Sequence, residues 1–329
     1  MQGEKLSQKD PLNQPAQERK FSLKAENNVP VCPVSGPESR PSLHPWRTLL
    51  IILALQGGLV YLFGFSLQAI LKKPFDMSKP TSLTVVLAFT LSEILAYLFA
   101  PYLLNVPVAR RSFREYLTDI RLNRFRPFWK LLTLTITCLI VLILCQGGGS
   151  VIYQLTLGRP VTSGFLSEVF DLGQVLPPRS FLILAFLYTM LEEVVFRGVL
   201  LQMLLRRHPV RRAILYSALA FGLAHLPAAI AGRSLVSTGG QVVWATLFGL
   251  FYATLVIETD SLVPAMSIHW LINVFQNSLT ASWQSMPAGL RALYGIVFGY
   301  GLAALVLIPW IRFFARKWLP GRRTEQLME

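Results

Sequence analysis

The segment Ser180–Arg207 reads SFLILAFLYTMLEEVVFRGVLLQMLLRR. It is long enough to cross a bilayer, which takes about 20 predominantly apolar residues. Its middle nevertheless carries Glu192, Glu193 and Arg197. Each ionised side chain at the centre of a membrane helix costs roughly 2.5 to 3.5 kcal/mol. Three charges in such a place indicate a helix that faces a protein interior and a functional site.

Helical geometry separates the two glutamates. Glu193 and Arg197 lie one turn apart, in the acid-before-base order that favours an ion pair within a helix. Glu192 is rotated by about 100° from Glu193 and by about 140° from Arg197. On spacing alone it has no partner in its own helix, so we expect one on another element.

The composition indicates a membrane protein. Of the 329 residues, 53% are hydrophobic and 15% are charged, against about 25% charged in soluble domains. The mean hydropathy is +0.49. The net charge of +14 comes from short basic clusters between apolar segments, a pattern that favours membrane topology over nucleic-acid binding. Cys32, Cys138 and Cys145 form no CxxC pair, so neither a disulfide framework nor a cysteine zinc site is expected.

The apolar segments predict an all-α, polytopic membrane bundle of about eight transmembrane helices. Residues 1–45 are polar and predict a disordered tail. Residues 46–316 form the transmembrane domain, and residues 317–329 a basic, then polar, C-terminal tail. The predicted spans are 46–71, 82–108, 128–154, 180–206, 211–231, 239–257, 261–282 and 288–312.

The basic residues predict the orientation of the bundle. With both termini in the cytoplasm, the cytoplasmic segments hold 23 lysines and arginines and the opposite face holds 7. This bias is the one the positive-inside rule describes, and it favours N-in and C-in, in the plasma membrane.

Two connecting segments have patterns of their own. Residues 108–130 place apolar residues at near-helical spacing among six arginines. They predict either an amphipathic helix on anionic headgroups or a solvated basic loop. Residues 153–179 predict a loop on the non-cytoplasmic face with one short helix around Phe165 to Phe170.

Two further spans carry polar side chains. His225 follows Phe221 by one turn in the fifth span, and His269 precedes Asn273 by one turn in the seventh. A single membrane histidine is more often a packing residue. A carboxylate, two imidazoles and an amide on three helices, however, are the groups needed to activate water and hold an oxyanion. Glu93, in the second span, is a rival carboxylate that we assign to packing or pore polarity.

At these residues the chain resembles the CPBP family of intramembrane proteases, also called the type II CAAX prenyl endopeptidase or Abi family. The family pattern is EExxxR, FxxxH and HxxxN, each on its own membrane helix, and the resemblance covers about residues 180–282. In this chain the motifs consist of Glu192, Glu193 and Arg197, of Phe221 and His225, and of His269 and Asn273.

The resemblance implies roles for these residues. Glu192 would be the general base that polarises water together with His225, and His269 and Asn273 would line the oxyanion site. Glu193 and Arg197 would orient the site. The family is labelled as metalloproteases, so zinc with Glu192, His225 and His269 as ligands is one possibility, and a metal-free mechanism is the other.

The sequence departs from the eukaryotic prenyl-processing members, which have extra histidines in the second motif. Ala224 and Leu226 flank His225 here, as in bacterial-type members. The substrate expected is therefore a peptide or protein in or at the membrane, and prenylated CAAX substrates are in doubt. Two other functions remain open: a proton-coupled transporter that uses the same residues as a relay, and a non-catalytic scaffold or immunity protein.

Overall fold

The computed structural model of the chain describes residues 43–77, 82–107, 112–170, 179–230, 232–279, 283 and 286–319. The predicted N-terminal tail lies outside these ranges up to residue 42, and so does the C-terminal tail from residue 320 onwards. All of the described residues belong to one unit, Pro41–Glu329.

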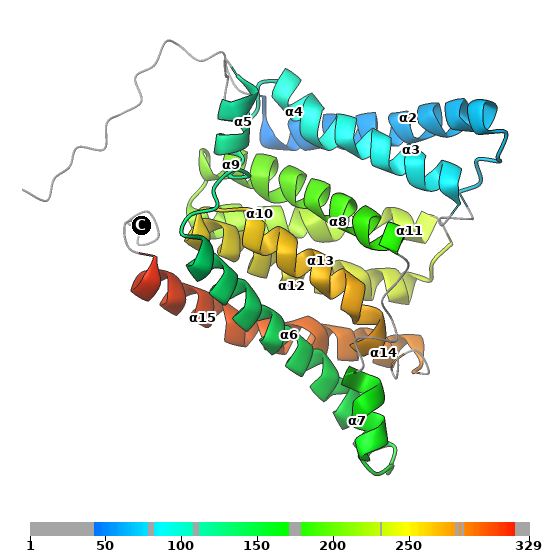
Figure 1. The fold of residues 1–329 in the computed structure, drawn as a ribbon, viewed down its shortest axis with the longest axis vertical. Coiled ribbons are helices and arrows are strands. Elements are labelled where there is room, and N and C mark those ends of the chain that lie inside the picture. Colours follow the sequence, from blue (N-terminus) through cyan, green and yellow to red (C-terminus); the bar gives the residue numbers. More distant parts are fainter. Residues whose placement is uncertain are drawn as a thin grey trace, which may run out of the picture. The chain divides into compact units, whose positions relative to one another are not determined.

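Every regular element among the described residues is a helix (Figure 1). The elements are α2 (Pro45–Leu71), α3 (Leu83–Glu93), η2 (Ile94–Phe99), α4 (Ala100–Leu103), α5 (Phe113–Asp119), α6 (Phe128–Thr156), α7 (Ser163–Phe170), α8 (Arg179–Glu193), η3 (Val194–Leu200), α9 (Leu201–Leu205), α10 (Val210–Leu223), α11 (Pro227–Ile230), α12 (Leu235–Thr259), α13 (Val263–Leu279), α14 (Ala288–Tyr294), η5 (Gly295–Gly301) and α15 (Leu302–Trp318). The elements labelled η are π-helical turns inside longer helices.

Five helical segments are long and apolar enough to cross a membrane, and they confirm the polytopic helical bundle. Each coincides with a predicted span. They are Pro45–Leu71, Leu83–Leu103, Phe128–Thr156, Leu235–Thr259 and Ala288–Trp318.

The other three predicted spans are also helical but shorter or more polar, so a count of eight stays a prediction. The fourth is continuous helix from Arg179 to Leu205 through α8, η3 and α9. The seventh is α13, whose apolar part is Val263–Phe275. The fifth, expected to extend to residue 231, ends early: α10 stops at Leu223, a turn follows, and α11 begins at Pro227.

The π-helical turn η3 begins directly after Glu193, and all seven of its residues are buried. Single π-helical turns inside α-helices occur often at functional sites, because the extra residue re-aims the side chains around it. The charges of the fourth span therefore point into protein. This explains how an apolar helix tolerates them.

Helices α10 and α12 pack closely because small residues line their contact. A Cβ added to Gly222 would clash with the Thr246 hydroxyl and would lie 2.7 Å from the carbonyl oxygen of Val242. A Cβ on Gly249 would lie 2.7 Å from the Cα of Ala218. Close approach through small residues is the usual way in which membrane helices associate. Here it places the C-terminal end of α10 against α12.

The segment 108–130 differs from both predictions made for it. Its described part holds a short helix, α5, that is capped by Ser112 and Glu115. Tyr116 and Ile120 are fully buried in the main hydrophobic core instead of facing lipid or water. A Cβ on Gly198 would lie 3.0 Å from the Cβ of Ile120, so the segment packs directly on η3.

Two arginines of the same segment pair with one carboxylate of the protein. Arg121 Nε lies 3.1 Å from one carboxylate oxygen of Asp260, and Arg124 pairs with the other oxygen. Asp260 lies at the turn between α12 and α13 with a φ of 51°, a left-handed conformation that Asp adopts more readily than most residues. These pairs join the α5 segment to the α12–α13 turn.

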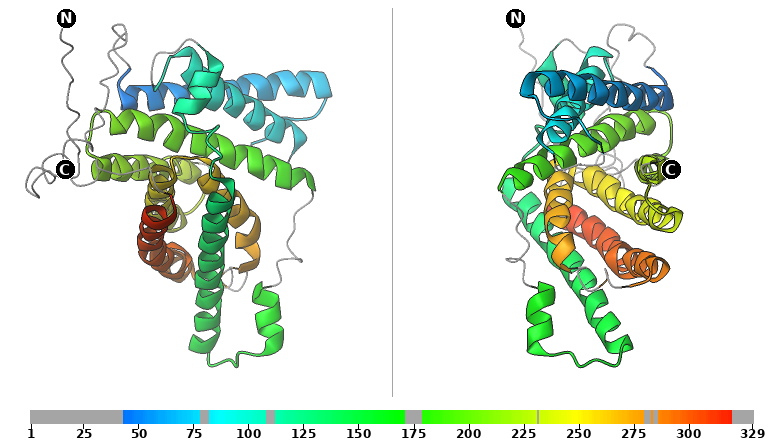
Figure 2. Two further views of the ribbon diagram at one scale, coloured as in Figure 1. Left: turned by 60° about the vertical axis from the view of Figure 1, so that its left-hand side comes forward. Right: turned by 90° about the vertical axis from the view of Figure 1, so that its right-hand side faces the viewer.

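The predicted short helix after α6 is confirmed as α7. Figure 2 shows α7 beside the end of α6. The ring of Phe170 occupies the space that Gly147 of α6 leaves by having no side chain. Among the described residues, Cys138 and Cys145 are free thiols.

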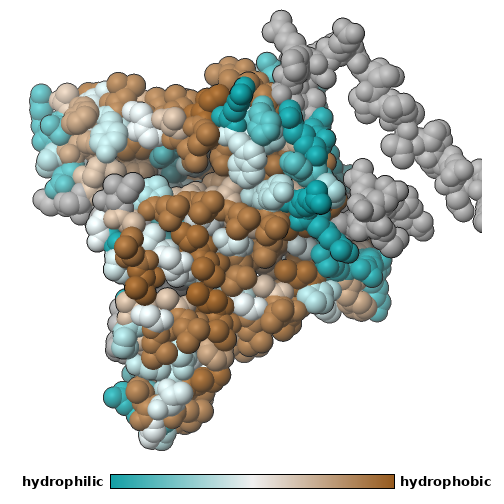
Figure 3. All heavy atoms as spheres, turned by 180° about the vertical axis from the view of Figure 1, so that it is seen from behind, coloured by the Kyte–Doolittle hydropathy of each residue, from teal (hydrophilic) through white to brown (hydrophobic). Residues whose placement is uncertain are grey.

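The surface is consistent with a lipid environment. Figure 3 shows a wide hydrophobic face, with hydrophilic residues gathered mainly towards one side of the view. Many large apolar side chains are exposed along the long helices, including Leu62 and Phe65 of α2 and Leu305 of α15. Large apolar surfaces of this kind mark interaction or membrane-facing sites. The chain is an integral membrane protein.

Candidate active site

The ion pair predicted within the fourth span is present. Arg197 Nη1 donates to Glu193 Oε1 at 3.0 Å, and both side chains are fully buried. The guanidinium of Arg197 also lies over the ring of Phe221, 4.2 Å from its centroid, and 5.4 Å from the ring centroid of Tyr252. Aromatic faces attract a desolvated cation, so the two rings complete the surroundings of Arg197.

His269 connects this ion pair to the other glutamate. Its Nδ1 lies 2.9 Å from Glu193 Oε1, and its Nε2 lies 3.8 Å from Glu192 Oε2. A carboxylate only accepts hydrogen bonds, so Nδ1 carries the proton and donates it to Glu193. Nε2 therefore faces Glu192. The ring of His269 stacks on Tyr252 with 5.0 Å between centroids, which fixes its plane.

His225 lies in the turn after α10 and not within the helix. Its Nδ1 lies 2.9 Å from the backbone carbonyl oxygen of Phe221. A carbonyl also only accepts, so Nδ1 is the protonated nitrogen and Nε2 is left free. The Phe221 ring packs edge-on against both imidazoles, with centroid distances of 5.2 Å to His225 and 5.9 Å to His269.

Asn273 lies one turn after His269 on α13, as its spacing predicts. Its amide Nδ2 donates to the Thr189 hydroxyl on α8 at 3.3 Å. The amide nitrogen has two hydrogens, so one remains after this bond. Thr189 was not expected from the sequence as part of the site, although it precedes Glu193 by one helical turn.

A cavity of about 200 Å³ brings the predicted residues together. Its lining includes Glu192, His225, His269 and Asn273. Glu193 and Arg197 do not line it and are fully buried behind it. Phe221 also lines the cavity, so five of the seven motif residues face it, and the other two, Glu193 and Arg197, pair behind them.

Other residues of the cavity were missed in the sequence. Tyr188 precedes Glu192 by one turn of α8 and lines the same cavity. Helical spacing alone places it on the same side of α8 as Glu192. Trp244, Phe248 and Tyr300 also line the cavity. They lie on α12 and η5, and no local pattern marks them.

Glu93 lies closer to the site than we expected. It is 3% exposed at the end of α3, and its carboxylate interacts electrostatically with Glu192. Helices α3 and α8 are in direct contact. Glu93, which we assigned to packing or pore polarity, therefore also interacts electrostatically with a residue of the cavity.

The described residues do not form a ready metal site. Among them, no group of three or more His, Cys, Asp or Glu side chains is placed to hold a metal ion. With Nδ1 protonated, Nε2 of both histidines carries a lone pair, which is suitable donor chemistry for zinc. As placed, however, these nitrogens and Glu192 do not form one coordination shell. Zinc therefore stays a prediction.

The fold and the cavity together define an integral membrane protein with a polar site buried between its helices. Residues 174–275 match the family model described as type II CAAX prenyl endopeptidase Rce1-like. This segment contains all three motifs, so the match confirms the resemblance seen in the sequence. No curated protein and no solved structure matches the chain.

Proposed function

We propose that the chain is an intramembrane endopeptidase in which Glu192 activates a water molecule. The observation that supports this most is the cavity of about 200 Å³ lined by Glu192, His225, His269 and Asn273, which come from α8, the turn after α10, and α13. A carboxylate and imidazoles around one enclosed space are the groups that general acid–base hydrolysis needs.

In the proposed first step, Glu192 accepts a proton from water while the water oxygen attacks the carbonyl carbon of the scissile peptide bond. His225 assists because its Nε2, which has no hydrogen-bond partner among the described residues, can accept the second hydrogen bond of that water. The step leaves a tetrahedral intermediate with one negatively charged oxygen. Glu192 then returns the proton to the leaving nitrogen as the carbon–nitrogen bond breaks.

The oxyanion of this intermediate needs hydrogen-bond donors. Asn273 offers the amide hydrogen that its bond to Thr189 does not use. His269 donates from Nε2 when it holds a second proton, and its Nδ1 bond to Glu193 then balances the charge. Donors fixed in advance at the position where charge develops are commonly the largest catalytic contribution.

Glu193 and Arg197 act by positioning. The two partners of Glu193 Oε1 are Arg197 and His269, so this carboxylate determines which way the imidazole faces. Partners of this kind, behind the reacting groups, fix tautomer and orientation. Neither residue needs to touch the substrate.

The proposed substrate is a peptide or protein segment in or at the membrane. The family description names prenyl endopeptidases, and a membrane site is consistent with a lipid-anchored or membrane-embedded chain. Because Ala224 and Leu226 flank His225, we propose membrane peptides or proteins in general and not prenylated chains in particular.

The test is cleavage of candidate membrane peptides by purified protein in liposomes. Wild type should cleave, and Glu192→Gln should lose activity by about 10²-fold or more, because general base catalysis contributes 10² to 10⁴. Equal cleavage by both proteins would contradict the role of Glu192. Proton-coupled solute flux without cleavage would instead support a transporter.

A further inference from the structure

A second cavity adjoins the catalytic one. It has a volume of about 190 Å³. Three residues line both cavities: Gln241 and Trp244 of α12, and Tyr300 of η5. The two cavities therefore share part of their walls.

The lining of the second cavity is positively charged. It includes Arg233 and Arg291 and contains no acidic side chain. Arg233 is hydrogen-bonded to Gln241. Arg291 is exposed, and no ion pair links it to an acidic residue in the described parts of the chain. Its helix is held beside α12, because a Cβ on Gly240 would lie 2.7 Å from the Cβ of Ala292.

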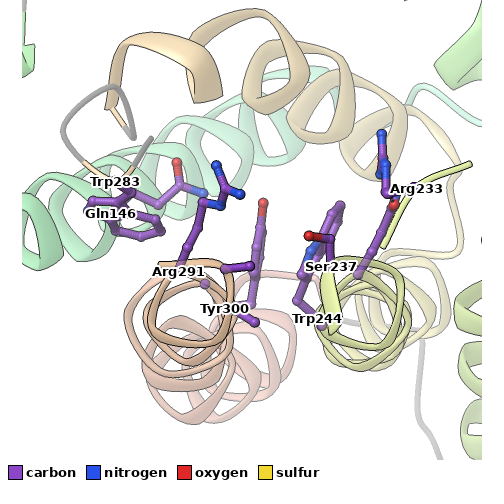
Figure 4. Close-up of a pocket in the computed structure, with 12 residues that line it drawn as sticks. Gln146, Arg233, Ser237, Trp244, Trp283, Arg291 and Tyr300 are labelled. Atoms are coloured by element: carbon purple, nitrogen blue, oxygen red, sulfur yellow. Dashed lines mark hydrogen bonds between the residues drawn. The ribbon is translucent and has the colours of Figure 1, made fainter. Parts of the chain in front are cut away.

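Buried polar groups without partners among the described residues line the same cavity. Gln146 of α6 is 0% exposed, yet neither its amide nitrogen nor its amide oxygen has a hydrogen-bond partner among the described residues. The indole Nε1 of Trp283 is also buried and unpartnered there. Figure 4 shows Gln146, Arg291 and Tyr300 around one opening. Buried polar groups are almost always paired, so such groups call for a ligand or water.

The chemistry of these groups selects the ligand. A guanidinium, an amide N–H and an indole N–H are all donors, and charge-assisted bonds from them to oxygen anions are the strongest of their kind. We propose that the second cavity binds an anionic oxygen group, a carboxylate or a phosphate, beside the catalytic cavity. The proposal rests on the proposed function, in which a substrate with a free C-terminal carboxylate near the scissile bond supplies this group.

The test uses binding, so it does not depend on turnover. An apolar, fluorescently labelled, N-acetylated peptide with a free C-terminal carboxylate is compared with its C-terminal carboxamide on the Glu192→Gln protein in neutral-lipid nanodiscs. The carboxylate peptide should bind about 10-fold or more tightly, a difference of about 1.4 kcal/mol, since hydrogen bonds to charged groups are stronger than those between neutral groups. Adding Arg291→Gln should remove this preference. Adding Arg159→Gln, which removes an exposed arginine outside both cavities, should keep it.

A second variant separates binding from folding. Gln146→Leu replaces an unpartnered buried amide with an apolar group, so thermal stability should not fall, while the preference for the carboxylate should weaken. The source of the anion is tested with inorganic phosphate and with nanodiscs of anionic lipid. If phosphate or anionic lipid raises thermal stability in an Arg291-dependent way, while both peptides bind equally, the site is supported with phosphate as its ligand.

Equal binding of both peptides with no Arg291-dependent effect of phosphate or anionic lipid would overturn the proposal. If wild type then also cleaves the peptides equally well in both forms and is unaffected by Arg291→Gln, the anion site is excluded while the proposed function is left intact. Conversely, an Arg291-dependent preference in binding without any cleavage by wild type would support the anion site and contradict the protease.

Discussion

Glu192 and Glu193 are neighbours in sequence, but their surroundings differ. The Glu193 side chain is fully buried and shares one oxygen between Arg197 and His269, whereas the Glu192 side chain is 12% exposed at the cavity. The buried pair is not fully satisfied, because Glu193 Oε2 and two nitrogens of Arg197 have no hydrogen-bond partner in the described residues. Breaking such a pair leaves an uncompensated buried charge.

We therefore expect Glu193→Gln to destabilise the protein by about 3–5 kcal/mol, because Arg197 loses its counter-charge in an apolar interior. Glu192→Gln, at the cavity, should change stability little while removing activity. The measurement is thermal unfolding of both variants in one detergent. A Glu193→Gln protein as stable as wild type would show that Arg197 does not depend on this carboxylate.

The amide of Asn273 is expected to act on the reaction and not on the fold. Asn273→Ala should lower kcat by about 10²–10³, the usual effect of losing one oxyanion donor. Thr189→Val, which removes only the acceptor that orients the amide, should cost less. Steady-state kinetics on both variants test this order. If Thr189→Val proves the more damaging change, the hydroxyl has a role of its own.

At the scale of elements, the contact between α10 and α12 determines where His225 lies. The His225 backbone N–H donates to the carbonyl of Gly222 at 3.1 Å, and Gly222 itself packs against Val242 and Thr246. Any shift of α10 away from α12 therefore moves the turn that holds the imidazole.

Gly222→Ala should reduce both stability and activity. The new methyl group clashes with Thr246 and with the backbone of Val242, and overpacking of this kind costs about 1–3 kcal/mol. Gly57→Ala is the matched control, because nothing lies within 4 Å of its added Cβ and Ala favours the helix by up to about 1 kcal/mol. Cleavage rate and unfolding temperature of the two variants give the answer. Loss of activity without loss of stability would still locate the effect at the turn.

The elements also show what the sequence could predict. Apolar periodicity located the long helices, and the one-turn spacing of Glu193 and Arg197 located their ion pair. Both features depend on local spacing. The turn at His225 was missed, since Ala224 to Leu226 continue an apolar run that has no breaking residue before Pro227. The contact of α5 with η3 was missed because it joins residues that are far apart in the chain. Tertiary contacts determine both features.

At the scale of the whole molecule, the basic cluster between α9 and α10 is exposed. Arg206 and Arg207 are exposed after α9, and Arg211 and Arg212 are exposed in the first turns of α10. Not every arginine counts equally, since Arg121 and Arg124 pair with Asp260. The bias of 23 basic residues against 7 therefore overstates the free charge on the predicted cytoplasmic face, although the excess remains on that side.

The orientation follows from this excess and can be tested directly. The three native cysteines are first replaced by serine, and one cysteine is then introduced as Arg206→Cys or as Arg159→Cys, so that each variant loses a single exposed basic residue. Because the positive-inside rule places the cluster around Arg206 in the cytoplasm, a membrane-impermeant maleimide should label Arg159→Cys in intact spheroplasts. It should label Arg206→Cys only after lysis. The opposite pattern would invert the bundle and place Arg233 and Arg291 of the second cavity on the cytoplasmic side, so that the anionic group would have to arrive from within the cell.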